Sequence, residues 1–187
     1  TALLGKNPKV THRFILDTDL DGYERFEDAV AAQPAEPLPS PRTEGLDMLY
    51  SSGTTGRPKG VKLPLSETEF GEVNAVTGLA QFLFGFDEDA VYLSPAPLYH
   101  AAPLRFSMGV QRIGGTVVVM EHFDPEQALA NIERYRVTTS QWVPTMFVRM
   151  LKLPAEVREK YDVSSLQVAI HAAAPCPVPV KEQMIEW

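Results

Sequence analysis

The sequence predicts an α/β fold in which a mostly parallel sheet is flanked by helices. First, short apolar or β-branched runs alternate with segments of helical period from residue 46 onward. Second, the alternation repeats, as it does where crossover helices join parallel strands. Third, the 187 residues are 44% hydrophobic and 22% charged, which suits one substantial core. The predicted strands lie near residues 47–50, 60–64, 90–93, 115–120, 138–142 and 166–170.

The first 45 residues are expected to form a separate part of the chain. Residues 13–16 are a short apolar run typical of a strand, and the acidic run at 17–21 is typical of a solvated turn. Residues 34–45 contain four prolines and no apolar period, which favours an extended connector. We therefore divide the chain into residues 1–45, a strand plus a proline-rich connector, and residues 46–187, the α/β domain.

Two helix starts stand out in the second part. Ser66 followed by Glu69 is a capping-box pattern and predicts a helix that runs to about residue 84. Asp124 followed by a proline predicts an N-cap and the first turn of a helix that ends near Tyr135.

Charge and hydropathy disfavour nucleic-acid binding and a membrane span. The 17 Lys and Arg against 24 Asp and Glu give a net charge of −7, whereas nucleic-acid binding depends on clustered cations. The most apolar long window, residues 73–86, is interrupted by polar side chains, and a span needs about 20 nearly unbroken apolar residues. No signal-peptide pattern is seen and Cys176 has no second cysteine to pair with, so a cytoplasmic location is expected.

A loop rich in glycine and hydroxyl groups between two predicted strands is the most informative stretch. Gly53 and Gly56 let backbone N–H groups approach an anion, four hydroxyls can donate, and Lys59 adds a positive charge. A Walker loop is excluded, because Pro58 precedes this lysine and Gly60 follows it. Polyphosphate binding is the favoured interpretation, and a plain surface hairpin is the alternative.

The string Tyr50-Ser-Ser-Gly-Thr-Thr-Gly-Arg-Pro-Lys-Gly-Val61 resembles the signature loop of the adenylate-forming superfamily, which includes acyl-CoA synthetases, luciferases and peptide-synthetase adenylation domains. The resemblance implies that this loop grips the β and γ phosphates of ATP and stabilises pyrophosphate as it leaves, with Lys59 as a catalytic residue. The residues it assigns to the nucleotide are Ser51, Ser52, Gly53, Thr54, Thr55, Gly56 and Lys59.

A second segment, residues 97–103, resembles the aromatic-plus-histidine segment that borders the acyl pocket in the same superfamily. The resemblance implies a catalytic and substrate-binding role for His100 and a substrate-binding role for Ala102. Taken alone, a histidine at a strand-to-helix junction is more often structural. Members that activate amino acids usually carry an Asp soon after this point, but residues 101–108 contain no acid. A plain carboxylic acid is therefore the expected substrate.

A third segment follows the predicted strand at 166–170. It resembles the small-residue loop on which the superfamily rests adenine and the acyl end of the substrate. The resemblance assigns Ala173, Ala174 and Pro175 to the nucleotide and His171 and Ala172 to the substrate. His171 and Ala172 depart from the usual Ser or Gly followed by Gly, so they are expected to narrow the pocket. Met146, Phe147 and Met150 are further candidates for its lining, although an apolar helix face is usually core.

The resemblance implies a ligase that uses ATP with Mg²⁺ to convert a carboxylic acid into an acyl-adenylate, and then transfers the acyl group to coenzyme A. No metal-ligand spacing is present, so no protein-held metal is expected. The chain resembles only the central part of the large N-terminal domain. We therefore expect the rest of the polypeptide to be missing and this fragment alone to be inactive. The alternatives are a non-catalytic nucleotide-binding module and another branch of the superfamily.

Overall fold

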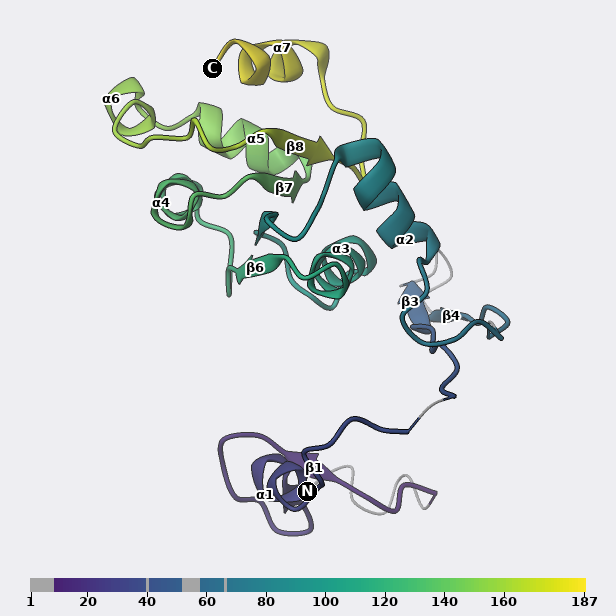
Figure 1. Ribbon diagram of the computed structural model, residues 1–187. Coiled ribbons are helices and arrows are strands. Elements are labelled where there is room, and N and C mark those ends of the chain that lie inside the picture. The colour runs from purple at the N-terminus through teal and green to yellow at the C-terminus, as the bar shows by residue number, and fades with distance from the viewer. Residues whose placement is uncertain (1–8, 40, 52–57, 66) are drawn as a thin grey trace. The chain divides into compact units, whose positions relative to one another are not determined.

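A computed structural model describes residues 9–39, 41–51, 58–65 and 67–187, and the backbone alone at Ser51 (Figure 1). The chain divides into two compact units, Thr1–Arg42 and Thr43–Trp187. This division falls three residues before the expected boundary at residue 45. Each unit is described by itself.

The first unit contains two short strands and one helix among its described residues. Strand β1 lies inside the predicted run at 13–16 and pairs in parallel with β2. The acidic turn at 17–21 between them is exposed, as expected. The second strand and the helix that follows it were not predicted. The elements are β1 (Phe14–Ile15), β2 (Glu24–Arg25) and α1 (Phe26–Ala31).

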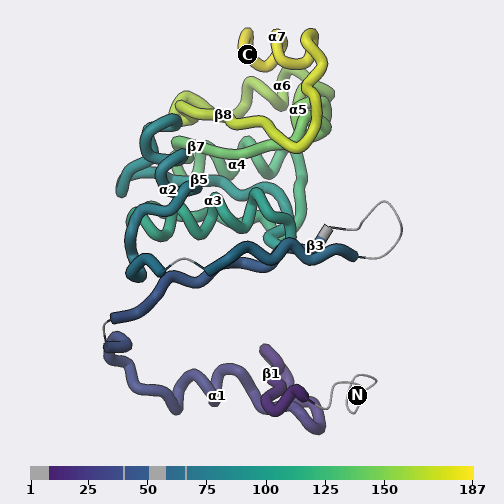
Figure 2. Tube along the Cα trace, turned by 90° about the vertical axis from the view of Figure 1, so that its right-hand side faces the viewer, coloured from purple at the N-terminus to yellow at the C-terminus, as the bar shows by residue number. Residues whose placement is uncertain are grey.

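The second unit is built on a parallel four-stranded sheet with the order β6-β5-β7-β8 (Figures 1 and 2). Every neighbouring pair in this sheet is parallel, which confirms the predicted fold class. All four strands lie within a residue or two of their predicted positions. They are β5 (Val91–Ser94), β6 (Thr116–Val119), β7 (Thr139–Trp142) and β8 (Val168–His171).

Strand β7 is central and fully buried although its sequence is Thr-Ser-Gln-Trp. The hydroxyl of Ser140 donates a 2.8 Å hydrogen bond to the carbonyl oxygen of Leu93 on the neighbouring strand. A buried hydroxyl is tolerated when it has such a partner. The hydroxyl of Ser140 is therefore compatible with the position of β7 inside the sheet.

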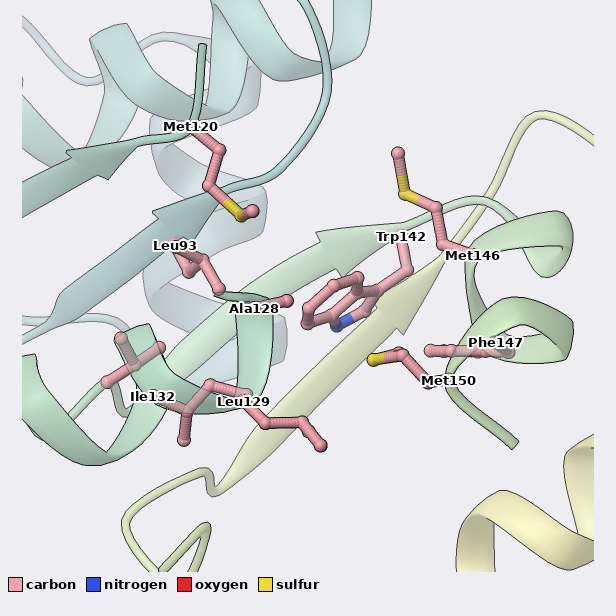
Figure 3. Packing of buried hydrophobic residues seen from close by; sticks show 10 residues of the cluster. Leu93, Met120, Ala128, Leu129, Ile132, Trp142, Met146, Phe147 and Met150 are labelled. Atoms are coloured by element: carbon pink, nitrogen blue, oxygen red, sulfur yellow. The ribbon is translucent and has the colours of Figure 1, made fainter. Parts of the chain in front are cut away.

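Helices cover both faces of this sheet. Successive strand residues point to opposite sides, so each strand contributes side chains to the packing on both faces. Tyr92 packs in a cluster with Val110 of α3, whereas the adjacent Leu93 packs in another with Trp142 and residues of α4 and α5. Figure 3 shows Trp142 at the centre of this second cluster, with Leu129, Phe147 and Met150 around it. The helices are α3 (Ala101–Arg112), α4 (Pro125–Tyr135), α5 (Pro144–Leu151), α6 (Ala155–Arg158) and α7 (Val178–Glu186).

The first two strands predicted for this unit do not join the parallel sheet. Strand β3 (Leu49–Ser51) pairs with β4 (Lys59–Val61) in an antiparallel hairpin of its own. Only seven residues connect the two strands, whereas a parallel connection needs a dozen or more. The short connection therefore dictates a hairpin.

The helix predicted to begin at Ser66 begins eight residues later. Ser66 lies outside the described residues, and Glu69 forms a bridge with Thr43 instead of a helical turn. Gly71 adopts a φ of +103°, which a helix cannot include. Asn74 is the observed N-cap, and its side chain accepts a 2.9 Å hydrogen bond from the N–H of Thr77. The helix consists of α2 (Ala75–Gly78), continued by the π-helical segment η1 (Leu79–Leu83).

The start of α4 was predicted correctly. The side chain of Asp124 accepts a 2.8 Å hydrogen bond from the N–H of Gln127, and Pro125 occupies the first turn. The helix ends at Tyr135, before Arg136 in the left-handed conformation. In the part of the chain that the structure describes, no helix is long and apolar enough to span a membrane.

Candidate active site

The carboxyl ends of the four parallel strands lie along one edge of the sheet. The loops that follow such ends are where ligands bind in open α/β sheets. His100 follows β5, and the segment from His171 to Pro175 begins at the end of β8. The sheet therefore brings the second and third predicted segments to the same edge.

His100 is the N-cap of α3. Its backbone is extended, with φ of −89° and ψ of 148°, and its carbonyl oxygen accepts a 3.2 Å hydrogen bond from the N–H of Leu104. The imidazole makes no capping hydrogen bond. It is exposed and lies against the ring of Tyr99, with 4.6 Å between ring centroids. The helix uses the backbone of His100, so the imidazole is available to a ligand. Ala102, in the first turn, is half-buried.

The end of β8 and the loop after it hold the candidate residues of the third predicted segment. His171 is the last residue of the strand, and its ring packs edge-on to Phe147 at 6.2 Å between centroids. The N–H of Ala172 donates a 3.1 Å hydrogen bond to the carbonyl oxygen of Trp142, which continues the pairing with β7. Ala173 then adopts a φ of +70°. From there to Pro175 the side chains are exposed.

The conformation of Ala173 is strained. A residue with a Cβ loses about 1–2 kcal/mol in the left-handed region, where glycine is favoured. Such strain persists only where the surroundings impose it, and it is common at ligand-binding loops. The position is therefore consistent with a binding loop.

A cavity of about 370 Å³ lies beside His171. It is bounded by residues of β7, β8, α4, α5 and α7, most of them apolar. Phe147 and Met150 line this cavity, whereas Met146 is not among its lining residues. That these three side chains line the acyl pocket stays a prediction.

The glycine-rich loop itself lies mostly outside the described residues. This holds for Ser52, Gly53, Thr54, Thr55 and Gly56, and at Ser51 only the backbone is described. Lys59 is exposed and begins β4, directly opposite Ser51 in the hairpin register. One residue on, a Cβ built on Gly60 would lie 3.0 Å from the ring of Tyr50, which covers the glycine. The lysine is thus anchored at the base of the loop.

Two ion pairs at the base of the hairpin were not found from the sequence. Arg105 pairs with Asp47 at 3.0 Å, and Arg112 forms two hydrogen bonds with the carboxylate of Glu44. The hydrogen bonds from Arg112 hold the pKa of Glu44 below its ordinary value, and the pair raises the pKa of Arg112. These partners are 58 and 68 residues apart, so no local pattern signals them.

Carboxylates and histidines do not gather into a metal centre within the described part of the chain. No group of three or more His, Cys, Asp or Glu side chains there has the arrangement of a metal site.

Comparison with known proteins decides the family. The family model described as AMP-binding enzyme matches residues 2–187. The chain belongs to the AMP-binding enzyme family. It is 32% identical over 142 residues to the putative acyl-CoA synthetase YngI of Bacillus subtilis, which covers 75% of this chain and 25% of that protein. It is 38% identical over 134 residues to 4-coumarate-CoA ligase 1 of Narcissus pseudonarcissus, covering 67% of this chain and 23% of that protein.

Solved structures agree with this assignment to the AMP-binding enzymes. The inhibitor-bound N-terminal domain of FACL13 from Mycobacterium tuberculosis is 25% identical, with a TM-score of 0.68 over 86% of this chain and 39% of that one. ATP-bound MatB from Rhodopseudomonas palustris is 25% identical, with a TM-score of 0.57 over 73% of this chain and 25% of that one. The fold is therefore that of part of the N-terminal domain of adenylate-forming enzymes. The chain spans about a quarter of the length of the two curated relatives.

Proposed function

We propose that the whole protein is a CoA ligase: it converts a carboxylic acid and ATP into an acyl-adenylate and pyrophosphate, and then transfers the acyl group to coenzyme A. The observation that carries the proposal is the family match over residues 2–187. Support also comes from the curated relatives, one a putative acyl-CoA synthetase and one a 4-coumarate-CoA ligase. Residues 46–187 would then be part of a larger AMP-binding domain.

The proposed roles follow from the chemistry of an anion attacking an anion. A carboxylate approaches the α-phosphorus of ATP, so donors and cations must neutralise the charge that builds up. We assign the β and γ phosphates to residues 51–56 and Lys59, whose exposed side chain stands at the base of the loop. Magnesium would arrive with the nucleotide and add positive charge beside the phosphates.

His100 and Ala102 are assigned to the carboxylate and its acyl group, together with His171 and Ala172. Ala173, Ala174 and Pro175 are assigned to the adenine. Two features support these roles: the imidazole of His100 is not used to cap α3, and the 171–175 segment shares the carboxyl edge of the sheet with it. The absence of an acidic residue at 101–108 favours a substrate without an ammonium group.

The test is acid-dependent exchange of labelled pyrophosphate into ATP by the complete protein. A panel of straight-chain fatty acids and hydroxycinnamic acids is offered with Mg²⁺, and amino acids serve as the negative set. We expect exchange with acids of the first two kinds. No exchange with any acid, or exchange with amino acids alone, contradicts the proposal. The 187-residue chain alone is expected to give no sustained exchange, and multiple turnovers by it would contradict that expectation.

A further inference from the structure

Two guanidinium groups on one face of α3 bind the segment that leads into β3. The Nε of Arg105 lies 3.3 and 3.2 Å from the two carboxylate oxygens of Asp47, and its Nη2 lies 3.0 Å from one of them. Arg112 donates from Nη1 to Glu44 at 3.0 Å and from Nη2 to the other oxygen of the same carboxylate. Fork-shaped contacts of this kind fix orientation as well as distance.

The spacing of the two pairs sets a register between the segment and the helix. Arg105 and Arg112 are seven residues apart, about two turns, so they share one face and are separated by about 10.5 Å along the axis. Glu44 and Asp47 are three residues apart, and three residues of extended chain span about 10 Å. The two lengths match. The segment therefore runs along α3 toward the N-terminal end of the helix, which is the end at His100. The trace in Figure 2 shows this segment beside α3.

The Arg112–Glu44 pair joins a third stretch of chain to the same place. Its side chains are only 18% and 14% exposed, so solvent screens the pair weakly. Arg112 also donates to the carbonyl oxygen of Glu72 at 2.9 Å, and the N–H of Gly71 donates to Glu44 at 3.3 Å. The Arg112–Glu44 pair thus contacts two stretches of chain: the one before β3, through Glu44 itself, and the one between β4 and α2, through Gly71 and Glu72.

We propose that Arg105 and Arg112 are positioning residues, which hold the β3–β4 hairpin in register with α3 and so fix Lys59 relative to His100. Asp47 lies two residues before β3, and Arg105 lies five residues after His100. The two ion pairs therefore connect the chain just before the hairpin with the helix that His100 begins. The consequence for catalysis rests on the proposed function, whereas the consequence for the hairpin does not.

The structural arm of the test is amide hydrogen exchange in this chain, with Arg105→Met and Arg112→Met. Both changes keep an apolar stem and remove the charge. We expect the amides of β3 and β4 to exchange about tenfold faster, while those of β7 are unchanged. Arg136→Met is the matched control, because it breaks the Arg136–Asp162 pair at 2.7 Å elsewhere in the unit, and it should leave the hairpin unchanged. Unchanged hairpin exchange in both variants overturns the proposal, as does equal acceleration in β7.

The kinetic arm uses the complete protein. Arg105→Met is expected to raise the KM for ATP about tenfold and to leave the KM for the acid within about twofold. The swapped pair, Asp47→Arg with Arg105→Asp, should restore both the KM and the hairpin exchange. Faster hairpin exchange with an unchanged KM for ATP overturns the positioning role. If the complete protein shows no pyrophosphate exchange with any acid, that result contradicts the proposed function instead. The register of the hairpin is then decided by amide hydrogen exchange alone.

Discussion

Gly115 passes so close to Ala90 that a Cβ built on the glycine would lie 2.8 Å from the Ala90 carbonyl oxygen. The same Cβ would lie 2.8 Å from a methyl group of Val110. The contact occurs where β6 begins, and the next N–H, of Thr116, donates a 2.8 Å hydrogen bond to that carbonyl. The glycine therefore lets the strand meet its neighbour.

We predict that Gly115→Ala lowers the free energy of unfolding by about 2–3 kcal/mol, the scale of overpacking against backbone that cannot move away. Urea unfolding at constant pH measures it. Gly109→Ala is the control: it lies within α3, and among the described residues outside the helix backbone its Cβ would meet only a Val76 methyl, at 3.7 Å. That change should be neutral or stabilise the helix by up to about 1 kcal/mol. Equal effects of the two changes contradict the prediction.

The left-handed conformation of Ala173 gives a second prediction. Ala173→Gly removes strain of about 1–2 kcal/mol and adds about 0.5–1 kcal/mol of unfolded-state entropy, so a net stabilisation of about 0.5 kcal/mol is expected. Ala172→Gly gains no such relief, because its φ is not positive, and should destabilise by about 0.5–1 kcal/mol. The readout is the difference between the two unfolding midpoints. A lower midpoint for Ala173→Gly than for Ala172→Gly would be the opposite of what the backbone predicts.

Asp162 makes stability depend on pH in the acid range. Hydrogen bonds from Ser164, and then from Arg136, lower its pKa to about 2 from an ordinary value of 3.8. A group with a lowered folded-state pKa stabilises the fold above its unfolded-state pKa, and that contribution is lost as pH falls through the folded-state value. The loss therefore occurs between about pH 4 and pH 2.

Asp162→Asn should flatten this part of the stability profile. We expect the variant to unfold more easily than the unchanged chain at pH 6 and almost equally at pH 2, measured by thermal unfolding at a series of pH values. Glu182→Gln, an exposed change on α7, serves as the control for net charge. If both variants shift the profile alike, the specific hydrogen bonds of Asp162 are not its cause.

Local patterns predicted the strands of the sheet, because β-branched and apolar runs are short-range signals. They also predicted the Asp124 cap, whose hydrogen bond spans three residues. The cap at Ser66 failed, although the pattern was equally good, because a bridge between Glu69 and Thr43 keeps the chain extended there. A tertiary contact thus overrode a local preference.

The same distinction applies to the candidate site. The place of His100 at a strand-to-helix junction and the place of His171 at a strand end follow from local patterns and from the geometry of parallel sheets. The pairing of Arg112 with Glu44 does not, since 68 residues separate the two and many other acidic side chains were possible partners. Contacts of this range emerge only from the packed structure.

The proposed role of Lys59 gives the last prediction. In the complete protein, Lys59→Ala should slow adenylate formation by about one to two decades, the scale of one lost charge-assisted contact to a phosphate. Thr54→Ala is expected to act similarly. Lys62→Ala is the matched control, because it removes an exposed lysine just after the same strand. It should leave the rate within about twofold, since it lies outside the residues assigned to the phosphates.

The measurement is again pyrophosphate exchange, at saturating ATP and acid, with thermal unfolding recorded for each variant. Lys59 is exposed and begins a short hairpin strand, so its removal should not unfold the chain. A normal rate in Lys59→Ala removes the lysine from the mechanism. An equal loss in Lys62→Ala would mean that the general positive charge of the hairpin acts on ATP, because only a directed contact distinguishes two lysines three residues apart.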